Sequence, residues 1–154
     1  MNRILIATIA SCALVTPALA IEPGSWKSTG EVVSFDMAMP PGMPASVTDM
    51  IKKQMTGKPH SSTQCIKAED IENAPEKMFK QSNGDCRYTT FDMSGGKLDA
   101  VAKCSMEGAT MTMTMTGSYT DTTYDSRMEM TGDAGMGKMT IISVGNGTRV
   151  GDCG

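Results

Sequence analysis

The second half of the chain alternates apolar and polar residues in runs separated by short intervals, several of which contain glycine. Period-two alternation is typical of half-buried strands, and short turns join antiparallel neighbours. The strands expected from this pattern are residues 85–93, 97–106, 109–119, 122–131 and 138–145. Strands do not alternate with long helices here, so the pattern predicts an antiparallel meander rather than a parallel sheet.

The first half is less regular. Apolar positions at helical spacing predict an amphipathic helix over residues 45–55, whereas residues 67–80 are helical in composition but interrupted by Pro75. Strands are expected at residues 24–39 and 60–66. The predicted fold class is mainly β with a minor α part: an antiparallel meander of about seven strands, forming a curved sheet or partial barrel, with one or two short helices between residues 44 and 80.

Three methionines alternate with threonines in the segment "TMTMTMT", residues 110–116. The next strand, "TYDSRMEM", places its charges on one face and Met128 and Met130 on the other, so the methionines are expected to point inward. A two-residue turn at Thr120 and Asp121 would place Met113 opposite Met128 and Met111 opposite Met130.

This methionine face has three interpretations. Methionine is a flexible core residue, and core packing is the simplest of the three. A pliable cavity of a few hundred Å³, bounded by these four methionines, could instead accept an apolar ligand. Thioethers also bind Cu(I) and Ag(I), and a metal site is better sought in the irregular segment "MAMPPGM" with Met37, Met39 and Met43.

The cysteines predict two disulfides. Of the five, Cys12 lies in the N-terminal apolar run, and the other four can pair in three ways. The interval "SGG", read as a three-residue hairpin loop, places Met93 opposite Lys97 and Cys86 opposite Cys104. Cys65 is then left to pair with Cys153. A Cys₄ metal site is the alternative, but the sequence contains no C-x-x-C pair.

The N-terminus predicts export. Arg3 precedes an apolar run and "TPALA", which together resemble a secretory signal, residues 1–20, cleaved after Ala20 to leave a single domain, residues 21–154. The protein would then be periplasmic or secreted. Alternatively "IASC" acts as a lipobox and the chain is lipid-anchored through Cys12. The apolar run is too short to span a bilayer, and no later segment could do so.

Composition and motifs narrow the function. After removal of Arg3 with the predicted signal, 13 lysine and arginine residues and 17 aspartate and glutamate residues remain, so the net charge is −4. The sequence contains no run of cationic residues, so a nucleic-acid partner is not expected. No nucleotide-binding, hydrolase or zinc-protease motif occurs, and His60 is the only histidine. We therefore expect no enzyme activity and no cofactor. "NGT", residues 146–148, matches a glycosylation acceptor but is more simply a turn.

Several motifs together resemble a known family. They are "PGSWK", "MAMPPGMP", "TQCI", "GDC", "KCSMEG" and the terminal "TRVGDC". The chain is similar over nearly its whole predicted mature length to the bacterial exported family called domain of unknown function 3617. The resemblance implies an exported, often periplasmic protein and carries over no activity or catalytic residue.

A weaker similarity is to lipocalin-like barrels, which have a G-x-W motif in the first strand and a late basic residue over the tryptophan. Gly24, Trp26 and Arg149 could take these positions. The similarity adds Trp26 and Arg149 to the candidate ligand-binding residues. The simpler interpretation is a buried tryptophan capped by a cation–π contact with Arg149. The sequence thus favours a non-enzymatic module that binds a small ligand or associates with the envelope, with Cu(I) or Ag(I) binding as the alternative.

Overall fold

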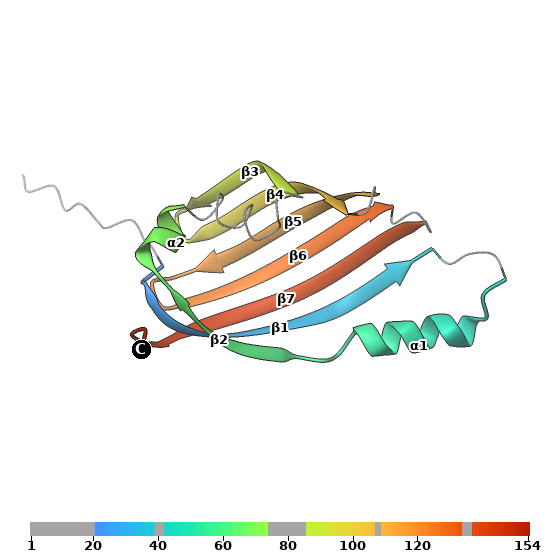
Figure 1. The fold of residues 1–154 in the computed structure, drawn as a ribbon, viewed down its shortest axis with the longest axis horizontal. Coiled ribbons are helices and arrows are strands. Elements are labelled where there is room, and N and C mark those ends of the chain that lie inside the picture. Colours follow the sequence, from blue (N-terminus) through green and yellow to red (C-terminus); the bar gives the residue numbers. More distant parts are fainter. Residues whose placement is uncertain (1–20, 39–41, 74–85, 107–108, 134–136) are drawn as a thin grey trace, which may run out of the picture.

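The computed structural model describes residues 21–38, 42–73, 86–106, 109–133 and 137–154. Its main feature is one open antiparallel sheet of seven strands in the order β2-β1-β7-β6-β5-β4-β3, which curves as a single layer (Figure 1). The strands are β1 (Gly24–Met37), β2 (His60–Ile66), β3 (Cys86–Ser94), β4 (Lys97–Met106), β5 (Ala109–Tyr119), β6 (Thr123–Asp133) and β7 (Lys138–Gly151). The predicted mainly β meander is confirmed, and the sheet does not close into a barrel.

Two short helices complete the described fold. Helix α1 (Ala45–Met55) has the predicted bounds and lies beside β1, beyond the part of β1 that pairs with β2 (Figure 1). Lys52 of α1 forms an ion pair of 3.1 Å with Asp36 of β1. Helix α2 (Ala68–Glu72) is one short turn, begun by a hydrogen bond from the Lys67 N–H to the Asp70 carboxylate. Neither helix in the described residues is long and apolar enough to cross a membrane.

The β3–β4 hairpin corrects one prediction. The turn has two residues, Gly95 and Gly96, both with positive φ, as a type I′ turn requires. Ser94 therefore pairs with Lys97, and Met93 with Leu98 rather than Lys97. A bulge between Tyr88 and Thr90 inserts one residue into β3, which brings Cys86 opposite Cys104 as predicted.

The β5–β6 turn corrects a second prediction. Tyr119 pairs with Tyr124, so four residues instead of two separate the last paired residues of β5 and β6. The Thr120 hydroxyl stabilises this loop by accepting hydrogen bonds from the backbone N–H groups of Thr122 and Thr123. The register is shifted by two residues from the predicted one: Met113 lies opposite Met130, Met115 opposite Met128 and Met111 opposite Gly132.

A shift by two residues keeps the faces, because side chains alternate with period two. The methionines therefore still share one face, here called the inner face. The charged residues of β6 lie on the outer face and are exposed. The core is thin and lies on the inner face, where the fully or nearly fully buried apolar residues are Trp26, Phe35, Ala100, Ala102, Cys104, Met111 and Tyr119.

Both predicted disulfides are present. Cys86 is bonded to Cys104 across the β3–β4 hairpin, and Cys65 at the end of β2 is bonded to Cys153 after β7. The second bond joins residues 88 positions apart and ties the β2 edge to the C-terminal segment. In the chain-entropy model, such bridges contribute about 3 kcal/mol for the hairpin and about 4–5 kcal/mol for the longer loop.

The segment "NGT" is not a turn. Strand β7 continues through it to Gly151, six residues beyond its predicted end. Gly147 is opposite Tyr124 of β6 and Ser28 of β1. A Cβ at Gly147 would lie only 2.2 Å from the Tyr124 ring. The glycine is therefore explained by the close approach of a ring, and no turn is needed.

Candidate functional site

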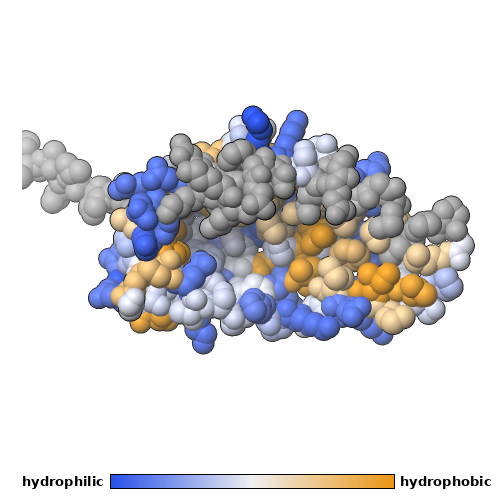
Figure 2. Space-filling view, in the orientation of Figure 1, coloured by the Kyte–Doolittle hydropathy of each residue, from blue (hydrophilic) through white to orange (hydrophobic). Residues whose placement is uncertain are grey.

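A groove of about 500 Å³ crosses the inner face of the sheet. We call it the cross-strand groove. Figure 2 shows one face of the molecule with a hollow and, on the side toward α1, a gathering of apolar residues. The inner-face residues that line the groove are Ser28, Gly30, Val32, His60, Ser62, Met115, Tyr124, Ser126, Met128, Ser143 and Gly145.

The floor of the groove consists of small residues aligned across neighbouring strands. Gly30 of β1 is opposite Gly145 of β7, which is opposite Ser126 of β6. The Ser126 hydroxyl donates to the Gly145 carbonyl at 3.3 Å, so it is held against the strand. A Cβ added at Gly30 would meet nothing closer than 3.9 Å. The missing side chain at Gly30 therefore leaves space above the sheet.

One wall of the groove is held firmly in place. The Tyr124 hydroxyl donates to Ser28 at 2.9 Å, while its ring lies over Gly147. The ring also packs near Trp26, with centroids 5.9 Å apart. A large aromatic side chain with contacts on several sides has little freedom to move. This wall therefore offers a pre-formed apolar surface that loses little entropy when a ligand binds.

The opposite wall is apolar and adaptable. Met115 and Met128 are opposite each other on β5 and β6, and Val32 and Ser143 extend this row onto β1 and β7. All four side chains are only partly buried. Methionine has three rotatable bonds and a polarisable sulfur, so the two thioethers can adjust to apolar groups of different shape.

The β2 end of the groove is polar. His60 is opposite Gly30, Ser62 is opposite Ser28, and Lys58 lies just before β2. A hydrogen bond from the Gly57 N–H to the Val32 carbonyl, 3.1 Å long, holds this segment against β1. The groove thus has an apolar part over β5 and β6 and a hydrogen-bonding part at the β1–β2 edge.

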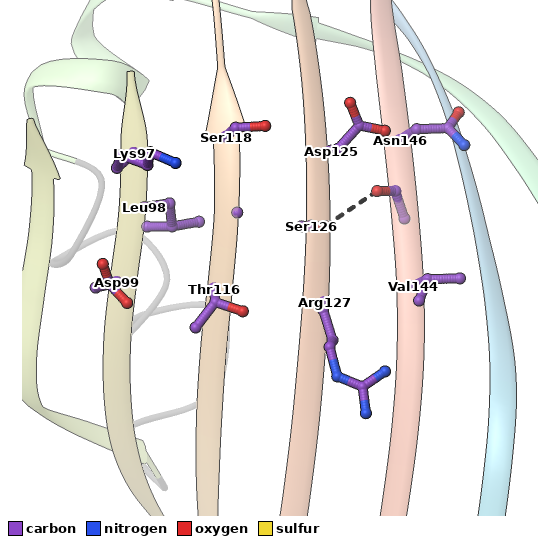
Figure 3. Close-up of a pocket in the computed structure, with 12 residues that line it drawn as sticks. Lys97, Leu98, Asp99, Thr116, Ser118, Asp125, Ser126, Arg127, Val144 and Asn146 are labelled. Carbon is purple, nitrogen blue, oxygen red and sulfur yellow. Dashed lines mark hydrogen bonds between the residues drawn. The ribbon is translucent and has the colours of Figure 1, made fainter. Parts of the chain in front are cut away.

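The outer face carries a second, more open depression of about 690 Å³, shown in Figure 3. Its walls include Lys97, Asp99, Asp125 and Arg127, charges of both signs. Among its other lining residues only Leu98 and Val144 have large apolar side chains, and the rest are threonine, serine, asparagine and glycine, so it offers little apolar surface for a ligand to bury. We therefore treat the cross-strand groove as the candidate site.

The predicted methionine cavity is only partly reproduced. Of the four methionines expected to bound it, Met128 lines the groove, together with Met115, which the wrong register had left out. Met111 is 1% exposed and belongs to the core. Met113 and Met130 are opposite each other one row further from the groove, and they are half-buried.

Trp26 and Arg149 do not line the groove. Trp26 is fully buried, and its indole N–H donates to the Glu22 carbonyl at 3.0 Å. Arg149 donates to the Pro23 carbonyl at 2.9 Å and forms ion pairs with Glu22 and Asp152. The G-x-W motif and Arg149 together fasten the segment before β1 to the end of β7, which gives them a structural role.

Of the three methionines proposed for metal binding, Met37 and Met43 lie in the described residues. Met37 ends β1 on the inner face, opposite Met139, whereas Met43 precedes α1 and is 39% exposed. Met39 lies outside the described residues. Within the described ranges, no group of three His, Cys, Asp or Glu residues could hold a metal ion. Thioether binding of Cu(I) or Ag(I) stays a prediction.

The fold and the groove define a disulfide-stapled, open antiparallel sheet with a small-molecule-sized groove on its inner face. The chain belongs to the family described as protein of unknown function, DUF3617, whose model matches residues 21–153. No curated protein and no solved structure matches it significantly. The family resemblance is thereby confirmed, whereas the lipocalin similarity is not supported.

Proposed function

We propose that the protein is a non-enzymatic module that binds a small, mainly apolar ligand in the cross-strand groove. The observation that carries this proposal is a groove of about 500 Å³ with a glycine and serine floor between a fixed tyrosine and two methionines. Small-molecule sites have volumes of about 300–1,000 Å³, largely apolar walls and a few polar groups. The groove fits this description.

A groove-filling variant tests the proposal. In Gly30→Phe the new ring enters the open space above Gly30, and it should weaken binding of the neutral fluorescent probe 1-N-phenylnaphthylamine by about tenfold or more, a free-energy difference of about 1.4 kcal/mol. Titration of probe fluorescence measures the dissociation constant. The matched control is Thr114→Phe, because Thr114 is an exposed outer-face residue that lines neither depression.

Circular dichroism and urea unfolding would show whether both variants remain folded, and Gly30→Leu is a smaller replacement if Gly30→Phe does not. The proposal is wrong if folded Gly30→Phe or Gly30→Leu binds the probe as well as the unchanged protein. It is also wrong if Thr114→Phe weakens binding to the same extent.

We further propose that the module acts outside the cytoplasm, as a periplasmic or secreted protein. Two features support this: the signal-like residues 1–20, and the two disulfides, which persist in oxidising compartments. Intact mass spectrometry of the full chain expressed in a Gram-negative host should give a mature protein starting at Ile21. A lipid-modified Cys12 or an uncleaved N-terminus would contradict cleavage after Ala20.

A further inference from the structure

The groove is chemically different at its two ends. Its apolar part lies over β5 and β6 at Met115 and Met128, and its polar part lies at β2 with His60, Ser62 and the nearby Lys58. Four strand spacings separate β2 from β5 in the sheet order, which is about 19 Å along the sheet. A ligand that contacts both ends must therefore be long, with one apolar and one polar part.

The polar end favours a negative charge. Lys58 is the only lysine or arginine among the groove-lining residues, and it has no carboxylate partner in the described part of the chain. Glu31 also borders the groove, but it is opposite Val144, which places it in an outer-face row. Ser62 and His60 add hydrogen-bonding groups beside Lys58. Donors of this kind bind carboxylate and phosphate oxygens.

We propose that the cross-strand groove takes an anionic amphiphile, with its acidic headgroup at Lys58 and His60 and its alkyl chain along Val32, Met128 and Met115. This inference rests on the proposed function and adds the ligand class. The fixed Tyr124 wall and the small residues of the floor leave a channel for the chain. The adaptable methionine wall can accept chains of different length and unsaturation.

Displacement of 1-N-phenylnaphthylamine by a series of twelve-carbon amphiphiles tests the inference. Dodecanoate should displace the probe at a concentration about fivefold lower than dodecan-1-ol, because exposed charge pairs contribute modestly, and dodecylammonium should be the weakest. Added salt should reduce this difference. Dodecyl phosphate in the same series shows whether a carboxylate or a phosphate headgroup is preferred.

The variant Lys58→Gln should remove most of the preference for dodecanoate over dodecan-1-ol, and His60→Gln should reduce it. The matched control is Lys53→Gln, which removes an exposed cation of α1 that does not line the groove. The inference is overturned if dodecan-1-ol binds as tightly as dodecanoate, or if the preference survives the double variant Lys58→Gln, His60→Gln.

The two proposals fail in different ways. If Gly30→Phe blocks both dodecanoate and dodecan-1-ol but the two bind equally, the groove binds apolar ligands and only the anionic class is wrong. If folded Gly30→Phe leaves the binding of both unchanged, the ligand site lies elsewhere and both proposals are wrong.

Discussion

At the scale of single residues, the inner face depends on glycines with two different purposes. Gly147 makes room for the Tyr124 ring, which would lie 2.2 Å from an added Cβ. Gly30 faces open space, where the nearest atom to an added Cβ is 3.9 Å away. The first glycine is required by packing, and the second leaves the groove empty.

These two glycines should therefore respond differently to the same substitution. Gly147→Ala must displace the Tyr124 ring, and overpacking of this kind lowers the free energy of unfolding by about 1–3 kcal/mol. Gly30→Ala fills open space and reduces the entropy of the unfolded chain, so it should be neutral or stabilise by up to about 1 kcal/mol. Urea unfolding of both variants measures the difference. Equal destabilisation would contradict the distinction between the two glycines.

The role of a single residue is hard to predict where a short sequence motif occurs in more than one structural setting. An Asn-Gly pair commonly marks a hairpin turn, but Asn146 and Gly147 lie within β7, since the glycine is needed opposite Tyr124. Similarly, G-x-W had two interpretations, a ligand-facing tryptophan and a buried one, and Trp26 is fully buried. The signal in both cases depends on a cross-strand neighbour, which the local sequence does not identify.

At the scale of elements, strand positions were predictable and registers were not. Period-two alternation located the strands of the second half and helical spacing located α1, because burial of one face imposes a fixed period, although β7 extends six residues beyond its predicted end. The length of a turn depends instead on the hydrogen bonds that individual side chains form with the backbone. The Thr120 hydroxyl accepts hydrogen bonds from two backbone N–H groups, and this connection between β5 and β6 is two residues longer than the predicted turn. The predicted pairing of Met113 with Met128 failed for this reason.

In the β3–β4 hairpin, two errors in the predicted pairing register cancel each other. A two-residue turn at Gly95 and Gly96 moves the pairing by one position relative to the predicted three-residue loop. The bulge at Thr89, whose hydroxyl donates to the Val101 carbonyl, moves it back before Cys86 is reached. The disulfide prediction was correct, but the register assumed for it near the turn was not.

At the scale of the whole molecule, one curved layer leaves an inner face that is only partly buried within the described residues. In a two-layer fold, a second layer would cover all the methionines of the inner face. In this single layer, Met111 is the only methionine of β5 and β6 that is fully buried. The sequence indicated which face is apolar. It could not indicate the groove, because Gly30, Gly145 and Ser126 align only in the true register.

The proposed function places a ligand between Tyr124 and the pair Met115 and Met128. The most direct measurement is NMR of protein carrying ¹³C-methyl methionine, titrated with dodecanoate below its micelle concentration. The methyl signals of Met115 and Met128 should shift with a common saturable dependence, while those of Met50 and Met55, exposed on α1, should not. Unchanged Met115 and Met128 signals, or shifts confined to Met50 and Met55, would show that the ligand does not bind in the cross-strand groove.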